Sequence, residues 1–119
     1  GSIFGSYSGL LSIIQQADPY LGINLDTGHS KAAKERVELL PAMYAGRIYA
    51  THLCDNSGNE NRSDPPGTGT VKWHSLMYGL HAAGYSGSYD LEIICQPGST
   101  TGSYKQGLQF IQELRGRTA

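Results

Sequence analysis

The order of apolar and polar positions along the chain predicts strands and helices in alternation. Three short apolar runs have the character of buried parallel strands, at residues 21–26, 47–53 and 88–94. Four stretches with apolar residues at helical spacing flank them, at residues 6–17, 31–44, 71–83 and 103–115. Pro41 predicts that the second helix ends early or contains a break. Strands that alternate with helices form βαβ units around a parallel sheet.

Side-chain alternation gives the strands two faces of different character. The residues expected to face the helices are apolar: Leu21, Ile23, Leu25, Tyr89, Leu91 and Ile93. Those expected on the other face are small or polar: Gly22, Asn24, Asp26, Asp90 and Glu92. A sheet covered by helices on both faces needs apolar residues on both, so this pattern favours the wall of a (β/α) barrel. We therefore predict an α/β fold, a partial (β/α) TIM barrel of about three parallel strands alternating with four helices.

Composition narrows the picture further. The 119 residues carry a formal net charge of −1, and no apolar run approaches the roughly 20 residues of a membrane span. We expect a single domain, residues 1–119, with no membrane partner. The absence of a Lys/Arg cluster in the sequence argues against nucleic acid as a partner. Two cysteines, Cys54 and Cys95, are too few for a disulfide framework, which predicts free thiols and a reducing, cytoplasmic location.

Three metal-competent side chains fall near the carboxyl ends of the three strands: Asp26, His52 and Glu92. Neighbouring parallel strands lie about 4.8 Å apart, so these groups are able to converge on one divalent ion. Two carboxylates and an imidazole suit Mn²⁺, Mg²⁺, Co²⁺ or Zn²⁺. Taken singly, each has an ordinary structural explanation, such as a helix cap for Asp26. His29 follows Asp26 by three residues, a position suited either to a contact with a metal-binding side chain or to a substrate contact. Trp73, His74 and His81 lie in a helical pattern and are expected to be structural.

Residues 55–70 form the longest polar stretch, and a loop of this length is more often functional or mobile than accidental. Together with its neighbours it carries motifs that resemble a known family. The segments LDTGH at residues 25–29, HLCDN at 52–56, PGTGTVKW at 66–73 and GYSG at 84–87, leading to LEI at 91–93, are similar to the C-terminal part of the xylose isomerase-like TIM barrel superfamily. That group contains sugar and sugar-phosphate isomerases and epimerases and the related endonuclease IV enzymes.

This resemblance implies a metal-dependent isomerase or epimerase that moves a proton next to a metal-polarised carbonyl of a sugar or sugar phosphate. Family members bind the metal through Glu, Asp, His and Glu on successive strands. Asp26, His52 and Glu92 match the last three, and Glu92 also matches a catalytic acid/base. His29 matches a substrate contact, and Arg62 falls in the loop that carries a substrate-binding Arg.

One element of the family pattern is missing. The first metal-ligating Glu belongs at the end of a strand before residue 6, where this chain has only Gly1 to Gly5. The loss of that group leaves open whether the chain is active alone, and it predicts a homo-oligomer or a missing N-terminal barrel half as partner. Two alternatives remain. An endonuclease IV-like phosphodiesterase should carry extra His between residues 55 and 70, where the sequence has none, and a non-catalytic fragment would self-associate through its sheet edges.

Overall fold

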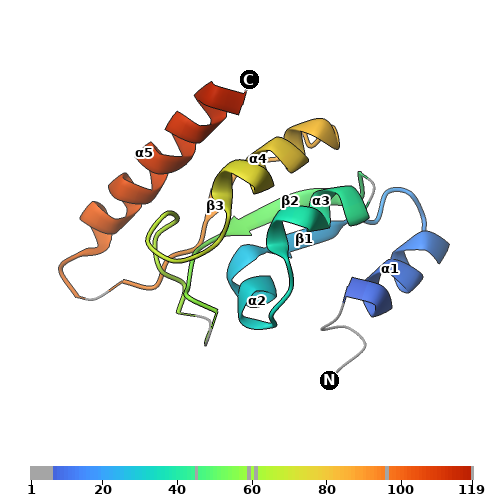
Figure 1. Cartoon of the computed structure of the whole chain (residues 1–119), viewed down its shortest axis with the longest axis horizontal. Helices are drawn as coiled ribbons and strands as arrows, with labels where there is room; N and C mark the ends of the chain where they lie inside the picture. The colour runs from blue at the N-terminus through green and yellow to red at the C-terminus, as the bar shows by residue number, and fades with distance from the viewer. Residues whose placement is uncertain (1–6, 45, 59, 61, 96, 119) are drawn as a thin grey trace.

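A three-stranded parallel sheet lies at the centre of the protein (Figure 1). The structure is a computed structural model that describes residues 7–44, 46–58, 60, 62–95 and 97–118. The strands lie side by side in chain order as β1 (Ile23–Asp26), β2 (Ile48–Leu53) and β3 (Asp90–Leu91). Both pairings are parallel, which confirms the predicted sheet. The position at which the family carries its first metal-ligating Glu falls within residues 1–5, which lie outside the described residues.

Helices connect the strands and follow them, as in a (β/α) barrel wall. They are α1 (Tyr7–Gln16), α2 (Thr27–Ala32), the 3₁₀ helix η2 (Val37–Leu39), α3 (Leu40–Met43), α4 (Trp73–Ala82) and α5 (Thr100–Thr118). Helix α4 packs against η2, α3 and α5. The predicted fold class, a partial (β/α) barrel, is confirmed. None of the described helices combines the length and the apolar character that a bilayer crossing needs.

The second predicted helix is wrong in its bounds. Instead of one helix over residues 31–44, α2 begins at Thr27, directly after β1, and ends at Ala32. Lys34 has a left-handed backbone (φ 64°), which ends helical geometry there. The chain turns helical again at η2 and α3. Pro41 does not break a helix, because it occupies the first turn of α3, where no backbone donor is required.

The outer strands are shorter than predicted. β1 starts at Ile23, and Leu21, expected to face the helices, is 58% exposed. β3 covers Asp90–Leu91 rather than residues 88–94. Beyond it, the N–H of Glu92 still donates to Leu53 O at 3.0 Å, but the N–H of Ile94 donates to Ser63 O at 2.9 Å. The third segment therefore leaves β2 and pairs with the loop that follows β2.

A β-bulge interrupts the pairing of β1 and β2. Ile23 pairs with Ile48, but the next residue, Asn24, pairs with Ala50. Tyr49 is therefore an extra residue of β2 with no partner in β1. One extra residue reverses the alternation of side chains between the two faces. The residues of β2 beyond the bulge consequently face the side opposite to the one that unbroken alternation from Ile48 would give.

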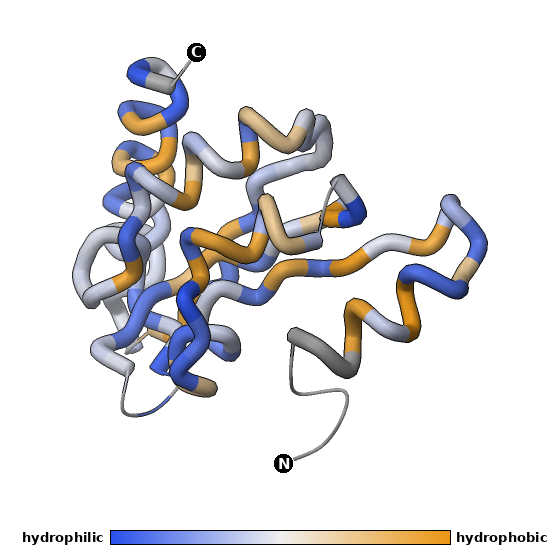
Figure 2. The backbone as a smooth tube through the Cα atoms, turned by 45° about the vertical axis from the view of Figure 1, so that its right-hand side comes forward, coloured by the Kyte–Doolittle hydropathy of each residue, from blue (hydrophilic) through white to orange (hydrophobic). Residues whose placement is uncertain are grey.

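The apolar core lies between the sheet and the helices. Figure 2 shows apolar residues along the central strands and alternating apolar and polar bands along α5. Trp73 is 4% exposed, which confirms it as a core residue, and its ring meets Phe110 edge-on at 6.1 Å between centroids. In α5, Ile111 and Leu114 are buried, whereas Leu108 is 51% exposed. Helix α5 therefore packs on the core through the face that carries Gly107, Ile111 and Leu114.

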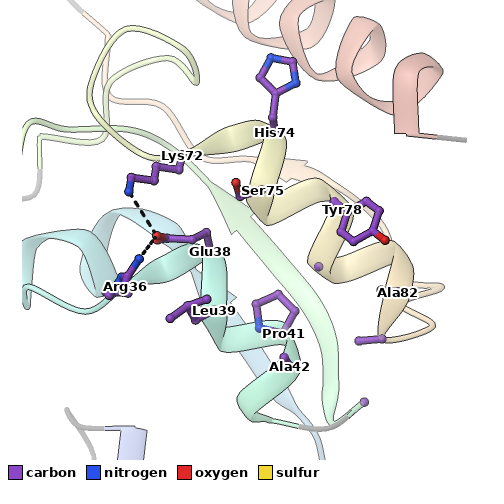
Figure 3. A pocket seen from close by; sticks show the side chains of 13 residues that line it. Arg36, Glu38, Leu39, Pro41, Ala42, Lys72, His74, Ser75, Tyr78 and Ala82 are labelled. Carbon is purple, nitrogen blue, oxygen red and sulfur yellow. Dashed lines mark hydrogen bonds and ion pairs between the residues drawn. The ribbon is translucent and has the colours of Figure 1, made fainter.

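A groove of about 780 Å³ has η2 and α3 on one side and α4 on the other (Figure 3). Its apolar wall comes from Leu39, Pro41 and Ala82, and Tyr78 stands at its edge. At one end the Glu38 carboxylate accepts from Arg36 and lies near Lys72. His74 lines the same groove and is exposed. His74 and His81 lie on α4 rather than among the strand-end residues, as the sequence predicted.

Candidate metal centre

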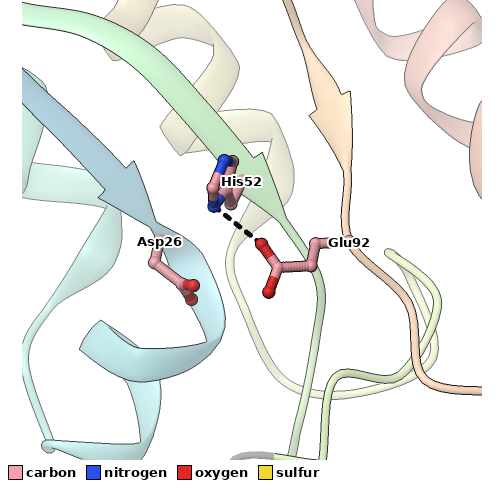
Figure 4. Close-up of side chains that lie close together, drawn as sticks. All are labelled: Asp26, His52 and Glu92. Carbon is pink, nitrogen blue, oxygen red and sulfur yellow. Dashed lines mark ion pairs between the residues drawn. The ribbon is translucent and has the colours of Figure 1, made fainter.

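Asp26, His52 and Glu92 converge at the carboxyl ends of the three strands. Asp26 ends β1, His52 lies on β2, and Glu92 directly follows β3 (Figure 4). One ligand atom from each lies within 4.8 Å of the others. His52 Nδ1 is 2.7 Å from Glu92 Oε2. The structure thus brings together the three residues that the sequence selected as metal ligands.

The bulge at Tyr49 determines where His52 points. Ile48 is buried against the helices, and unbroken alternation in steps of two would send His52 into the same core. Instead Thr51 and Leu53, both 0% exposed, take the core positions after the bulge. His52 therefore faces the open side of the sheet, beside its register partner Asp26.

Asp26 combines a structural and a chemical position. Its Oδ1 accepts from the N–H of His29 at 2.9 Å and so caps the first turn of α2. Its Oδ2 lies 3.1 Å from His29 Nδ1. The side chain of Asp26 is 20% exposed and that of His29 is 75% exposed. The ordinary explanation, a helix cap, is thus correct for Asp26, and the same carboxylate also has one oxygen within 4.8 Å of ligand atoms of His52 and Glu92.

Two polar residues beside the site, Asn24 and Thr27, were not predicted from the sequence to belong to it. Asn24 Nδ2 lies 3.3 and 3.4 Å from the two ring nitrogens of His52. Its place two residues before Asp26, on the same strand face, was the available signal. Thr27 is fully buried, and its hydroxyl donates to Cys54 O at 2.7 Å and accepts from the N–H of Cys54 at 3.0 Å. This exchange ties the ends of β1 and β2 together.

The donor set suits a hard or borderline divalent cation. Two ligands bound at right angles to one ion at about 2.1 Å lie about 3 Å apart, close to the 2.7 Å between His52 and Glu92. Burial, with the charges of Asp26 and Glu92, raises the pKa of the nearby Cys54 thiol to about 11. At neutral pH the metal-free site therefore holds Cys54 as an uncharged thiol. Three protein ligands leave coordination positions for substrate oxygens or water.

Arg62 lies apart from these residues. Its Nε donates to Asp64 Oδ2 at 3.2 Å, and its Nη1 is 3.9 Å from Glu60 Oε1. Within the described part of the chain, no hydrogen bond or ion pair joins Arg62 to the three strand-end residues. Its expected contact with substrate therefore remains a prediction. A cavity of about 330 Å³ does open beside Asp26 and His29.

The loop after β2 is organised by the buried carboxylate of Asp55, which the sequence did not mark as an anchor. Asp55 is 0% exposed, and its carboxylate accepts four hydrogen bonds. The donors are the backbone N–H groups of Asn56, Gly67 and Val71, at 2.9, 3.0 and 3.1 Å, and Trp73 Nε1 at 2.7 Å. Backbone hydrogen bonds in both directions also join Asp55 to Asp64. The loop is thus anchored by a buried carboxylate.

The parallel sheet, with helices on one face and polar groups at the carboxyl ends of its strands, is part of a (β/α) barrel. The comparison with known families is more specific. The chain belongs to the xylose isomerase-like TIM barrel family, whose model matches residues 1–114. This result confirms the resemblance noted in the sequence. No curated protein matches the chain.

Solved structures with the same fold include proteins described as epimerases. An L-ribulose 3-epimerase superposes with a TM-score of 0.78 at 19% identity, over 99% of this chain and 44% of its own. A D-tagatose 3-epimerase-like protein gives 0.72 at 21%, over 97% and 44%. A xylose isomerase domain protein from Planctomyces limnophilus gives 0.73 at 23%, over 95% and 44%. The chain thus spans less than half the length of these structures.

Proposed function

We propose that this chain forms the metal-binding part of an isomerase or epimerase that acts on a sugar or sugar phosphate. The observation that carries the proposal is the convergence of Asp26, His52 and Glu92 within 4.8 Å at the strand ends. Membership of the xylose isomerase-like family and the likeness to two structures described as sugar epimerases support it. The proposed domain comprises residues 1–119 and corresponds to the C-terminal part of a complete barrel.

Each of the three residues has a distinct role in this proposal. Asp26 and His52 hold the divalent ion (Mn²⁺, Mg²⁺, Co²⁺ or Zn²⁺), with Glu92 as the third ligand. A metal at this position supplies Lewis-acid polarisation of the substrate oxygens. Glu92, whose side chain is 53% exposed on the open side of the sheet, takes up and returns the proton of the carbon next to the carbonyl.

His29 and Arg62 are proposed to contact the substrate. His29 turns Nδ1 toward Asp26, and among the described residues its Nε2 has no hydrogen-bond partner. That nitrogen is thus available to a sugar hydroxyl. Asp26 orients the imidazole through its contact with Nδ1, in the way that a carboxylate fixes the tautomer of a functional histidine.

Epimerisation requires proton exchange on two faces of one carbon, and Glu92 serves one face only. The chain also covers 44% of the length of the similar structures. We therefore propose that a further barrel segment, or a second copy of this chain, supplies the second acid/base and a fourth ligand. The substrate is a sugar with a carbonyl next to the carbon that loses its proton, since metal-assisted proton transfer needs that carbonyl. That carbon is inverted in an epimerisation, and in an isomerisation it is oxidised to the new carbonyl while the original carbonyl carbon is reduced.

Metal binding by the chain itself provides the direct test. Calorimetric titration with Mn²⁺ should show weak binding to the unmodified chain, and His52→Ala and Asp26→Ala should abolish it. Glu113→Gln, a carboxylate on α5 that contacts only Gln109 in the described structure, is the matched control and should bind as the unmodified chain does. Unchanged affinity in both site variants would exclude the assignment. His52→Ala is the cleaner variant, because Asp26 also caps α2.

A further inference from the structure

A second cleft gathers positive charge away from the strand-end carboxylates. It measures about 320 Å³ and lies between the segment that follows β1 and the loop that follows β2. Its charged lining consists of Lys31, Lys34, Arg36 and Lys72, with Glu35 and Glu38. Four of the nine Lys and Arg residues of the chain therefore meet in one cleft, although the whole chain carries a net charge of −1. Lys31, Lys34 and Arg36 are close together in the sequence, and folding brings Lys72 beside them.

Two of the lysines lie next to each other over Gly58. A Cβ built on Gly58 would lie 3.6 Å from Lys31 Cε and 3.8 Å from Lys34 Nζ. Lys34 Nζ donates to the carbonyl oxygen of Gly58. The ammonium of Lys31 has no hydrogen bond or ion pair within the described residues. Two adjacent like charges repel each other, so an anion placed between them would relieve a real electrostatic cost.

The acidic residues of the cleft do not cancel this charge. Glu38 is only 10% exposed, with its Oε2 at 3.5 Å from Arg36 Nη2 and 3.8 Å from Lys72 Nζ (Figure 3). One carboxylate thus holds two cations in place, and each cation retains further N–H donors. Burial raises the pKa of Glu35, and even with both carboxylates ionised the four cations leave a formal excess of two positive charges.

The loop wall of the cleft is held in place from beneath. Asn56 is 1% exposed, and its Nδ2 donates to Gly28 O at 3.0 Å. Its Oδ1 accepts from the N–H of Gly58 at 2.7 Å. This side chain fixes Gly58, and with it the Lys34 contact, relative to the start of α2. Gly58 and the ammonium of Lys34 are therefore positioned before any ligand arrives, which lowers the entropic cost of binding at this point of the cleft.

We propose that this cleft binds the phosphate group of a small molecule through Lys31, Lys34, Arg36 and Lys72. A phosphate dianion accepts several short charge-assisted hydrogen bonds, and arginine and lysine are its usual partners. The volume suits a phosphate with a short attached group. A nucleic acid would need a basic surface extended along its backbone, whereas these four cations gather around this cleft and the adjoining end of the larger groove. The site is separate from the proposed metal centre and does not depend on it.

Calorimetric titrations at low ionic strength with inorganic phosphate, fructose 6-phosphate and fructose test the proposal. Binding of both phosphates without binding of fructose is the expected result. A tighter constant for fructose 6-phosphate than for inorganic phosphate would identify a phosphate ester as the ligand, and equal constants would identify the phosphate group alone as the recognised unit. Failure of both phosphates to bind would overturn the proposal.

Charge-removing variants locate the site. Lys31→Gln should weaken phosphate binding about tenfold or more, as expected for one charge-assisted hydrogen bond, and Lys72→Gln should act in the same direction. Lys105→Gln, on the exposed surface of α5, is the matched control and should have no effect. If Lys105→Gln lost as much phosphate affinity as Lys31→Gln, the loss would reflect the net charge of the chain, and the proposed site would be refuted.

Two further readouts separate this proposal from others. Mn²⁺ affinity should be unchanged in Lys31→Gln, so failure of the metal centre and failure of the phosphate site are distinguishable. A single-stranded oligonucleotide should bind no better than inorganic phosphate. Tight oligonucleotide binding that is lost in Lys31→Gln would replace the small-molecule ligand by a nucleic acid and so overturn the proposal.

Discussion

Asp55 shows how one buried carboxylate can hold a long polar loop. Its four donors come from the backbone of the loop and from the Trp73 ring, which itself belongs to the core. Gly69 passes so close that a Cβ there would lie 2.5 Å from Asp55 Oδ1 and 2.3 Å from Asn56 O. The contact therefore requires both the carboxylate and a residue without a side chain opposite it.

We predict that Asp55→Asn lowers the free energy of unfolding by about 3 kcal/mol, because an amide N–H₂ would face donors in place of an oxygen. Asp64→Asn removes a partly exposed carboxylate from the same loop and should change stability by less than about 0.5 kcal/mol. Urea unfolding of both variants gives the comparison. Equal stability of the two variants would contradict the role assigned to Asp55.

The two cysteines should differ sharply in reactivity. Cys54 is 1% exposed, and with a pKa of about 11 only about one molecule in a thousand carries its thiolate at pH 8. Cys95 is only partly buried. Iodoacetamide should therefore label Cys95 at least about tenfold faster than Cys54 in the folded chain, as read by peptide mass spectrometry. The difference should disappear in urea, and equal rates without urea would show that Cys54 is accessible.

The sequence singled out the strand-end residues Asp26, His52 and Glu92, but not the buried residues that hold the neighbouring loop in place. Asp26, His52 and Glu92 stood out because an apolar run ended in, or contained, a group that binds metals. Asp55 has the same residue type at a similar position, yet its side chain is buried in a ring of N–H donors. Nothing local distinguishes the two carboxylates, because the donors of Asp55 lie up to 18 residues away in the chain.

Among the secondary-structure elements, the bulge in β2 is the feature that depends most on one neighbour. Gly22 lies under the ring of Tyr49, and a Cβ on Gly22 would meet Tyr49 Cδ2 at 2.0 Å. The hydroxyl of Tyr49 donates to Pro19 O at 2.5 Å, so the ring is held at its far end too. The bulge residue thus has little freedom to move away.

We predict that Gly22→Ala costs about 2 kcal/mol of stability, in the range of overpacked sites, and weakens Mn²⁺ binding because His52 shifts with the bulge. Gly102→Ala on α5, where a built Cβ meets nothing outside its own helix within 4 Å, is the control. It should not lower stability, because alanine is the better helix former, and it should leave Mn²⁺ affinity unchanged. Thermal unfolding and the Mn²⁺ titration measure the two effects. Full metal affinity in Gly22→Ala would show that the bulge does not position His52.

The element order was predictable, and the bounds of α1, β1, β2 and α4 agree with the predicted ones to within two residues, whereas those of the second helix, β3 and α5 do not. Alternating apolar and helical stretches gave the parallel sheet, since period 2 and period 3.6 are local properties of the sequence. The break in the second helix follows from Lys34, a residue type with no particular preference for positive φ. The bulge at Tyr49 shows no sign in the sequence, because only the pairing with β1 defines it. Likewise, β3 is short because Ile94 pairs with a distant loop residue.

At the scale of the whole molecule, the sheet retains open edges. Within the described residues, β1 and β3 each have one strand neighbour, and the side of the sheet that carries His52 is open to solvent. Large apolar side chains near the strands are also exposed: Tyr20 at 93%, Leu21 at 58% and Ile94 at 71%. Such edges and apolar residues are templates for another chain.

We therefore predict self-association, with two partial barrels joined through their sheet edges. Sedimentation equilibrium at micromolar concentration should give a mass close to twice that of the chain. Replacement of Ile94 by Lys should shift the equilibrium toward monomer, whereas the same change at the exposed Leu108 on α5 should not. A monomer mass with a cooperative thermal transition would defeat the dimer.

The closure of the loop after β2 by Asp55 has a consequence for protein engineering. Both ends of the 55–64 segment are joined by paired backbone hydrogen bonds, and the following turn is held by the same carboxylate. The entropic cost of closing a loop grows only slowly with its length. A peptide inserted between Gly58 and Ser63 should therefore lower the free energy of unfolding by only about 0.6 kcal/mol for each doubling of the loop length. This segment is thus a natural graft point, where foreign epitopes or recognition sequences can be displayed while the strand ends keep their spacing.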